Sequence, residues 1–304
     1  TVDWHRYPDR GAWELRERLA AHHSLTPEQV FVANGSNEVL QTLTLTYAGP
    51  GRTVAVFEPT YAMHSQIAKV AGSTVAEGRR APDLSLDLAE VARVCAEADP
   101  AITYVCSPNN PTGMIETEET VQAVLDVAPG LVVVDEAYSQ FAPWSARELL
   151  DDDRNLVVTR TFSKTWSMAA ARLGYLLAPA WLVEQLDKVV LPYHLDALKQ
   201  VAGTLALDFV DEMNERVSLL VEERGRLQAA LAELPVDVWP SSANFILFRP
   251  RTRSGDDVWK ALLDESVLVR NCSSWPGLDD CLRVTIGTRD EDDRFLDALR
   301  KALQ

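Results

Sequence analysis

Residues 102–113 read ITYVCSPNNPTG, an apolar run that ends in a turn rich in proline and glycine. The same pattern returns in residues 131–138, LVVVDEAY, and in residues 156–164, LVVTRTFSK. A further β-branched run extends from Thr53 to Phe57. Short runs of this kind predict buried strands, because parallel strands that are covered on both faces are apolar throughout.

Helical patterns separate these runs. Apolar residues recur at helical spacing from Tyr61 to Ala71 and from Glu118 to Val127. The alternation predicts βαβ units and an α/β fold with a mostly parallel, helix-covered sheet. We also expect a strand from Val30 to Ala33, a helix from Val39 to Tyr47 and a surface helix from Gly11 to about His22.

The C-terminal part of the chain predicts a second, smaller domain. Residues from about Leu195 to Leu234 have helical periodicity and few breakers, so we expect long helices leading away from the sheet. Beyond Pro235 we expect a smaller α+β domain with strands at Asn244 to Phe248, Val267 to Arg270 and Leu282 to Ile286, and with helices at Asp256 to Glu265 and from Glu291. The predicted units are an N-terminal segment (1–29) that packs with the small domain, a large domain with the connecting helices (30–234) and the small domain (235–304).

Composition excludes several classes of partner. The chain has 304 residues and a formal net charge of −16, so it would be repelled by nucleic acid and by anionic membranes, and we expect neither as a partner. No stretch approaches the roughly 20 apolar residues of a membrane span, and TVDWHRYPDR has no signal-peptide pattern, so we expect a cytoplasmic protein. The four cysteines lack CxxC spacing and the five histidines are scattered, so we expect reduced thiols and no metal site.

Polar residues follow four of the apolar runs, at the strand ends where open α/β sheets bind ligands. These segments are Asn34 to Glu38, Ser107 to Gly113, Asp135 to Tyr138 and Thr161 to Lys164. Each has an ordinary explanation as well: turn chemistry for the asparagines, helix capping for the carboxylate, and a solvated position for the lysine. Small residues at a helix start can also leave backbone N–H groups free to bind a phosphate.

Together and in this order, the four segments resemble fold-type I pyridoxal-phosphate aminotransferases. The stretches SPNNPTG, DEAY and TFSKTWSMAAARLGY carry the resemblance, which runs from Arg6 to the C-terminus. It implies pyridoxal 5'-phosphate as the cofactor, with Lys164 forming a Schiff base and later moving the substrate's α-proton. Asp135 would pair with the pyridinium nitrogen and keep it protonated. Asn110 and Tyr138 would hydrogen-bond the ring oxygen.

The resemblance also implies how the rest of the cofactor is held. Tyr61 would stack on or beside the ring and contact the substrate. The phosphate would be held by the N–H groups of two residues at a helix start, two hydroxyls and a guanidinium: Ser36, Asn37, Thr161, Ser163 and Arg172. Tyr7 matches a family tyrosine that reaches the phosphate from the other subunit, which implies a homodimer. In this family an N-terminal arm also precedes the segment that begins at Thr1 and helps cover the substrate.

Two arginines of the small domain are the expected substrate contacts. Arg283 matches a family arginine that binds the substrate's carboxylate or phosphate, and period-2 geometry places it on the opposite face from Leu282 and Val284. Arg270 is the second candidate, and two arginines suit a doubly charged phosphate. With PYHL (192–195), NFILF (244–248) and CLRVT (281–285), this similarity favours the histidinol-phosphate branch. The reaction expected there converts histidinol phosphate and 2-oxoglutarate into imidazole-acetol phosphate and glutamate in histidine biosynthesis.

Other functions remain open at this point. Aromatic-amino-acid (phenylalanine) aminotransferases share most of these letters, and a phosphothreonine decarboxylase shares the lysine segment. A non-catalytic relative is a further alternative, whereas a dinucleotide-binding protein is disfavoured because no G-x-G-x-x-G follows the first strand. Two departures from the family pattern are Asn37, where Asp is frequent, and Ala170-Ala171, where Ala-Gly is usual.

Overall fold

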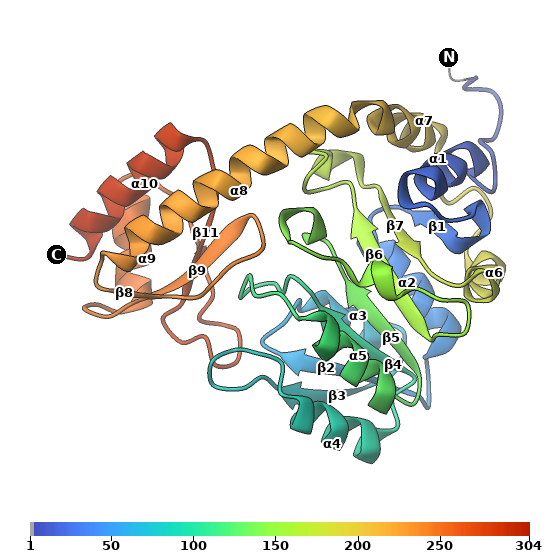
Figure 1. Ribbon diagram of the computed structural model, residues 1–304, viewed down its shortest axis with the longest axis horizontal. Coiled ribbons are helices and arrows are strands. Elements are labelled where there is room, and N and C mark those ends of the chain that lie inside the picture. The colour runs from blue at the N-terminus through green and yellow to red at the C-terminus, as the bar shows by residue number, and fades with distance from the viewer. Residues whose placement is uncertain (1–2) are drawn as a thin grey trace.

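A seven-stranded sheet with the order β1-β7-β6-β5-β4-β2-β3 forms the centre of the computed structural model, which describes residues 3–304 (Figure 1). Its strands are β1 (Val30–Ala33), β2 (Thr53–Glu58), β3 (Thr74–Arg79), β4 (Ile102–Cys106), β5 (Leu131–Asp135), β6 (Leu156–Thr161) and β7 (Gly174–Leu177). Strands β2 to β6 pair in parallel, whereas β7 runs antiparallel to both β1 and β6. The predicted α/β fold with a mostly parallel sheet is confirmed.

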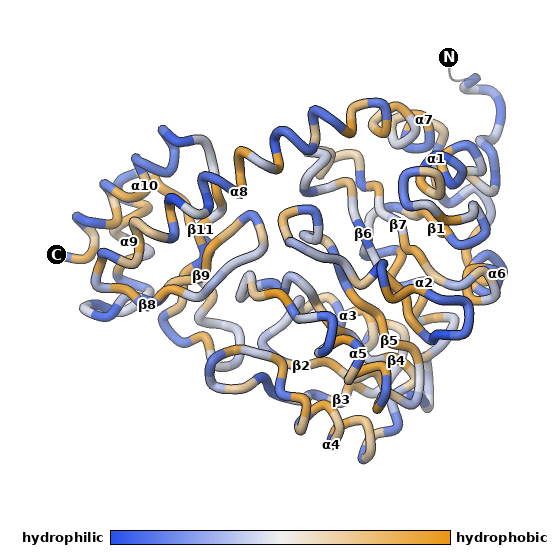
Figure 2. Tube along the Cα trace, in the orientation of Figure 1, coloured by the Kyte–Doolittle hydropathy of each residue, from blue (hydrophilic) through white to orange (hydrophobic). Residues whose placement is uncertain are grey.

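Helices cover both faces of this sheet, as the period of the strands requires. Along β5, Leu131 and Val133 face one apolar core, and Val132 and Val134 face the other. The first core is covered by α2 (Ser36–Tyr47), α3 (Met63–Val70) and α6 (Ala180–Val189), and the second by α1 (Trp13–His23), α4 (Leu88–Ala98) and α5 (Glu118–Val127). Each fully buried valine or leucine contributes roughly 1.5–3 kcal/mol, so these two layers hold the large domain together. Figure 2 shows the apolar strands between the helices.

The second sheet has four strands in the order β10-β11-β9-β8 and forms the small domain. Its elements are β8 (Val236–Val238), β9 (Phe245–Pro250), α9 (Gly255–Asp264), β10 (Arg270–Asn271), β11 (Leu282–Thr285) and α10 (Arg289–Ala302). Strand β11 pairs antiparallel with β9, and Arg283 lies opposite Leu247 in that register. β8 begins next to the boundary predicted at residue 235.

Two helices connect the domains: α7 (Ala197–Ala206) and α8 (Val210–Ala232). The longer one, α8, belongs to both cores. Its Met213 and Val217 pack in the large domain, and Leu227 and Leu231 pack in the small one. In Figure 1 α8 runs along the top of the molecule from one domain to the other. The predicted long connecting helices are therefore present.

The N-terminal segment differs from its prediction. Residues 1–29 were expected to pack with the small domain, but α1 packs on β1 and α7, at the other end of the molecule (Figure 1). Leu15 and Leu19 enter the large domain's core, and a Cβ atom on Gly203 of α7 would lie 2.9 Å from Leu15. The apolar face of α1 is thus buried against the large domain. The first two residues of this segment lie outside the described part of the chain.

Three findings bear on the class of protein. All four cysteines, Cys95, Cys106, Cys272 and Cys281, are buried free thiols. Within residues 3–304, no helix is long and apolar enough to cross a membrane. In the same range, no group of three or more His, Cys, Asp or Glu side chains is placed to hold a metal ion.

Candidate active site

A cavity of about 250 Å³ opens at the carboxyl ends of β4, β5 and β6, where the small domain meets the large one. Its walls include most of the residues singled out from the sequence, namely Ser36, Asn37, Tyr61, Asn110, Asp135, Tyr138, Thr161, Ser163, Lys164, Arg172 and Arg283. Cys106, Ala137 and Ala169 complete the wall. A larger hollow of about 620 Å³ lies at the opposite edge of the sheet, around Arg52 and Trp181, and contains none of these residues.

Lys164 stands on a turn that follows β6. The turn is fixed because Ser163 N donates to Thr161 Oγ1 at 3.1 Å and Ser167 N donates to Lys164 O at 3.0 Å. Phe162 is fully buried between the rings of Trp166 and Tyr175, so the backbone beneath the lysine is anchored in the core. The amine therefore enters the cavity from a rigid base, and its Nζ lies 5.0 Å from the centre of the Tyr138 ring.

The surroundings of Lys164 favour its neutral form. Its side chain is open to solvent through the cavity mouth, but the walls exclude enough water to lower the pKa of the amine, and the positive charge of Arg283 lowers it further. Asp135 acts in the opposite direction and raises this pKa, but it is the weaker influence. A lysine with a lowered pKa is suited to serve as a nucleophile and as a base.

Asp135 forms the buried base of the cavity, at the last position of β5. It is 2% exposed, and its Oδ1 accepts a hydrogen bond from Ala137 N at 3.2 Å. Its Oδ2 lies 2.9 Å from Nε2 of His64, a fully buried residue of α3. Because the carboxylate can only accept, Nε2 must carry the proton.

His64 was missed in the sequence. Its ring stacks on Tyr104 at a centroid distance of 4.4 Å, which fixes its orientation against Asp135. The one signal available was its position three residues after Tyr61, which places both side chains on the same side of a helical turn. That spacing does not reveal that His64 contacts the carboxylate of Asp135 in β5.

Two hydrogen-bonded residues connect the domains across the cavity. Arg283 Nη1, from β11 of the small domain, donates to Oδ1 of Asn110 in the large domain. The same guanidinium lies 4.5 Å from the centre of the Phe245 ring, which in turn packs edge-on against Tyr138 at 5.1 Å. Burial raises the pKa of Tyr138 to about 12, so its hydroxyl stays protonated and can donate a hydrogen bond.

The start of α2 has groups that can bind an anion. Ser36 and Asn37 are its first two residues, whose N–H groups have no partner within the helix. Arg172 closes the site and donates to Ser163 Oγ at 3.3 Å and to Ala169 O at 3.1 Å. Gly35 is required here, because its φ is +80° and a Cβ atom would lie 2.6 Å from Arg172 Nη2.

This arrangement suits a phosphorylated pyridine aldehyde. A helix start, hydroxyl groups and a guanidinium together bind a phosphate. At the other end of the cavity, the carboxylate of Asp135 can accept a hydrogen bond from a protonated ring nitrogen, and Lys164 can supply the amine for the aldehyde. Tyr61 forms a wall between these ends, with its hydroxyl donating to Asn37 Oδ1 at 3.1 Å.

Two predicted residues lie outside the cavity wall. Tyr7 is 79% exposed and stacks on Tyr193 at 4.5 Å. Arg270 is exposed and lies over the ring of Trp275, with 5.2 Å between the guanidinium and the ring centre. Arg270 is nevertheless paired directly with Arg283 across β10 and β11, and directly opposed residues share a face of the sheet.

Comparison with known proteins agrees with this geometry. The chain matches the family described as aminotransferase class I and II over residues 1–299. It is 42% identical over 303 residues to histidinol-phosphate aminotransferase 2 of Nitrosococcus oceani, covering 98% of this chain and 84% of that protein. The histidinol-phosphate aminotransferase of Streptomyces avermitilis is 43% identical over 305 residues, with coverages of 97% and 81%.

A solved structure shows the same fold. The histidinol-phosphate aminotransferase of Sinorhizobium meliloti in complex with pyridoxal-5'-phosphate superimposes with a TM-score of 0.89 at 24% identity, covering 98% of this chain and 83% of that one. The matched fold, the nearly full-length sequence similarity and the lysine, carboxylate and arginine in one cavity lead to one conclusion. The chain is a member of the class I and II aminotransferases.

Proposed function

We propose that this enzyme transfers the amino group of histidinol phosphate to 2-oxoglutarate in histidine biosynthesis, with pyridoxal 5'-phosphate bound at Lys164. The observation that carries the proposal is the convergence of Lys164, Asp135 and Arg283 on one cavity. The two relatives at 42% and 43% identity are both named histidinol-phosphate aminotransferases, which supports the choice of substrate.

The residues of the chain divide the chemical work. When bound, pyridoxal phosphate supplies an aldehyde that takes up amino groups and a ring that withdraws electrons from the substrate's α-carbon. Lys164 Nζ takes the proton from that carbon and later returns a proton, which its lowered pKa favours. Asp135 would pair with the protonated ring nitrogen, and Tyr138 and Asn110 would orient the ring through its oxygen.

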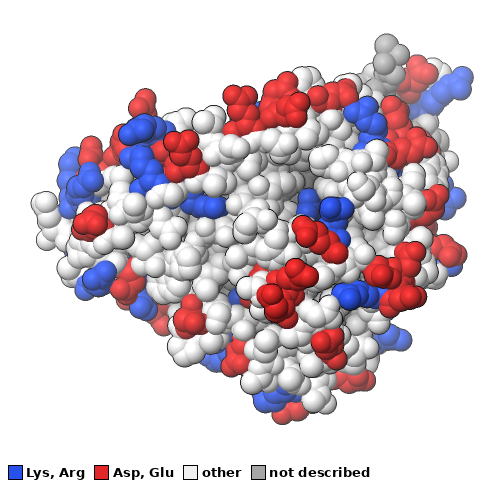
Figure 3. Space-filling view, in the orientation of Figure 1, with Lys and Arg blue, Asp and Glu red and all other residues white. Residues whose placement is uncertain are grey.

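Arg283 and Arg270 are proposed to recognise the substrate. Arg283 reaches the cavity, and its hydrogen bond to Asn110 supports a place for its guanidinium beside the ring. Arg270 lies beside it on the same face of the small sheet, next to the half-buried Trp275. Two neighbouring guanidinium groups favour a phosphorylated substrate over a neutral aromatic one. The two arginines also make the proposed substrate site positively charged in a protein whose visible surface is rich in acidic side chains (Figure 3).

The substrate assignment is tested with paired substrates. Purified protein with pyridoxal phosphate and 2-oxoglutarate is mixed either with histidinol phosphate or with phenylalanine, and glutamate is measured. We expect faster glutamate formation with histidinol phosphate. No glutamate from histidinol phosphate would reject the proposal, and preference for phenylalanine would support an aromatic-amino-acid aminotransferase. Release of carbon dioxide from threonine phosphate would instead indicate the decarboxylase.

The place of the cofactor is tested with Lys164→Ala. We expect borohydride treatment of the loaded wild-type protein to fix pyridoxal phosphate on the peptide that contains Lys164, and the variant to retain the fold but neither the label nor turnover. A labelled peptide elsewhere would show that another amine binds the cofactor. Circular dichroism of both proteins checks that the fold is unchanged.

We propose a homodimer as the active unit. Large apolar side chains are exposed in the segment before α1 and at its start, between α6 and α7, and on α7 and the turn that follows it. They are Trp4, Tyr7, Trp13, Leu191, Tyr193, Leu198, Val201, Leu205 and Phe209. A second copy of the chain would cover such a surface. We further propose that the enzyme acts in the cytoplasm, where its four buried thiols stay reduced.

A mixing experiment tests whether Tyr7 serves the partner's site. Lys164→Ala and Tyr7→Ala are each purified, then mixed under conditions that exchange subunits. A mixed dimer has one site with both side chains, so activity should exceed the sum of the separate proteins. Activity equal to that sum, together with a dimer of normal mass, would remove Tyr7 from the proposed site.

A further inference from the structure

The cavity has two walls that come from different loops. Tyr61 follows β2 in the loop Pro59-Thr60-Tyr61, and Asn110 belongs to the loop that follows β4. Because β2 and β4 are neighbouring parallel strands, both loops leave the same edge of the sheet. The distance between the loops therefore sets the width of the site at the ring.

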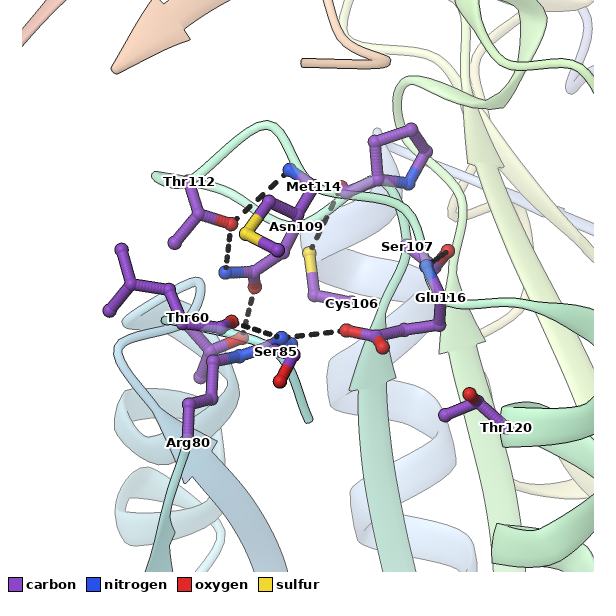
Figure 4. A network of polar contacts seen from close by, with 12 residues as sticks. Thr60, Arg80, Ser85, Cys106, Ser107, Asn109, Thr112, Met114, Glu116 and Thr120 are labelled. Atoms are coloured by element: carbon purple, nitrogen blue, oxygen red, sulfur yellow. Dashed lines mark hydrogen bonds and ion pairs between the residues drawn. The ribbon is translucent and has the colours of Figure 1, made fainter. Parts of the chain in front are cut away.

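The two loops are joined through Asn109, whose side chain is completely buried (Figure 4). Its Nδ2 donates to Pro59 O and to Thr112 Oγ1, both at 3.0 Å. Its Oδ1 accepts from Thr60 Oγ1, also at 3.0 Å. The amide cannot turn over, because a flip would direct its oxygen at the Pro59 carbonyl, which is another acceptor.

The backbone of Asn109 is fixed as well. Its N–H donates to Met114 O, and its carbonyl accepts from Gly113 N, both at 2.7 Å. These bonds close the turn that presents Asn110, the next residue. Asn109 thus holds Asn110 in place through the main chain while its side chain holds the opposite loop.

Thr60 connects Asn109 to the small domain. Its N–H donates to Glu58 Oε2 at 3.0 Å, and its carbonyl accepts from Trp275 Nε1 at 3.0 Å. The Thr60 hydroxyl donates to Asn109, so all three polar groups of Thr60 are hydrogen-bonded, each to a different residue. Tyr61, the next residue, is therefore oriented from three directions.

We infer that Thr60 and Asn109 act as a pair of positioning residues for transamination, setting the spacing between Tyr61 and Asn110. Neither side chain lines the cavity. The inference rests on the proposed function, since the spacing matters because Tyr61 and Asn110 contact the cofactor. A loosened pair misplaces both groups, and a small displacement of a binding group is enough to slow catalysis.

Thr60→Val is the most selective test. The change removes the hydroxyl, leaves the backbone bonds in place and strands Asn109 Oδ1 without its donor. Thr60→Ser keeps the hydroxyl and should behave as wild type. Thr204→Val is the matched control, because the buried hydroxyl of Thr204 donates only to Gln200 O within α7. For Thr60→Val we expect about a tenfold weaker hold on pyridoxal phosphate and about a tenfold lower kcat.

Amide hydrogen exchange of the cofactor-free protein gives a readout that does not depend on activity. Thr60→Val should speed exchange in residues 107–114 as well as in its own loop, whereas Thr60→Ser and Thr204→Val should not. Unchanged exchange in residues 107–114 would overturn the pairing, whatever the enzyme does. Failure of the wild-type protein to bind pyridoxal phosphate would instead count against the proposed function.

A double-mutant cycle completes the test. If the two residues act as a pair, adding Thr60→Val to Asn109→Ala should weaken cofactor binding and kcat little further. Fully additive losses would overturn the inference. A lower melting temperature for Thr60→Val with unchanged cofactor affinity and kcat would also overturn it, since that is the result expected of a purely structural bond. If Asn109→Ala does not fold, hydrogen exchange, cofactor affinity and kcat of Thr60→Val decide whether the inference holds.

Discussion

Nε2 of His64 lies 2.9 Å from Oδ2 of Asp135, so the carboxylate at the base of the cavity is fixed by a buried donor. A second donor, Ala137 N, lies on its other oxygen. These two hydrogen bonds fix the orientation of the Asp135 carboxylate and leave its remaining lone pairs free for a partner in the cavity. The carboxylate is therefore prepared to receive a protonated ring nitrogen.

Asp135→Asn should nearly abolish turnover while leaving the fold intact. The amide has the same shape but cannot balance a positive ring nitrogen, so we expect kcat to fall at least about 100-fold and cofactor binding to weaken. Cofactor titration by absorbance and steady-state kinetics measure both effects. Asp126→Asn, on the exposed face of α5, is the control, and equal losses in the two variants would contradict the assigned role.

Capture of pyridoxal phosphate by the cofactor-free enzyme should depend on pH through Lys164. Only the neutral amine reacts, and burial followed by the charge of Arg283 lowers its pKa, so the rate should rise with pH below the ordinary lysine range. Arg283→Gln removes one lowering influence and should move the midpoint of the pH–rate curve to higher pH. Stopped-flow absorbance at a series of pH values measures this midpoint. Arg300→Gln, on the exposed face of α10, should leave the midpoint in place, and a shift of the Arg283→Gln curve to lower pH would contradict an electrostatic effect of Arg283 on the amine.

Removing the arginines should affect the substrate more than the cofactor. Arg283→Ala should raise KM for histidinol phosphate far more than it alters the affinity for pyridoxal phosphate, because the side chain lines the cavity from the small domain and is proposed to bind the substrate. Arg270→Ala should raise KM for histidinol phosphate and leave KM for 2-oxoglutarate less changed. Steady-state kinetics with both substrates decide the matter. Equal losses of substrate and cofactor affinity would show that Arg283 is misassigned.

Asp292 should make the stability of the protein fall as pH rises. This carboxyl group of α10 is 2% exposed, and burial raises its pKa to about 6. The folded state then keeps a proton that the unfolded state releases near pH 4, so stability is lost between about pH 4 and pH 6. Asp292→Asn removes this loss and should stabilise the protein by roughly 1–3 kcal/mol above pH 6, with no gain below pH 4. Urea unfolding at several pH values measures the difference, with the exposed Asp297→Asn as control; a gain independent of pH would refute the mechanism.

Elements near the cavity could be predicted from the sequence where a local pattern, either an apolar run or apolar residues at helical spacing, specifies them. Ile102–Cys106 and Glu118–Val127 have the bounds expected from the letters alone. In the first, every residue is buried, and in the second Thr117 caps the helix by accepting from Thr120 N at 3.2 Å. The polar residues predicted to follow the parallel strands line one cavity for a related reason, since parallel strands bring their carboxyl ends to one edge of the sheet.

Elements at the edges were harder to predict. β3 (Thr74–Arg79) is an edge strand with exposed and half-buried positions, so it lacks a continuous apolar run. The strand expected over Val267 to Arg270 begins only at Arg270, because Val267 and Val269 pack into the small core without pairing. Such positions depend on neighbours that are remote in the sequence.

Contacts between distant segments were not visible in the sequence at all. His64 meets Asp135 across 71 positions, and Asn109 meets Thr60 across 49. Neither pairing has a local pattern, because the sheet order brings the partners together. The placement of Tyr7 and Arg270 outside the wall likewise depends on packing rather than on motif.

The alignment of β11 with β9 decides the electrical character of the cavity. Opposite Leu247, the side chain of Arg283 faces the cavity, while Leu282 and Val284 enter the apolar core beneath α9 and α10. A slip of one position would exchange these two sets, burying a guanidinium in oil-like surroundings and offering leucine to an anion. The proposed preference for a phosphorylated substrate therefore depends on the backbone hydrogen bonds between β9 and β11, and a change that loosens this pairing should weaken that preference without altering any polar side chain.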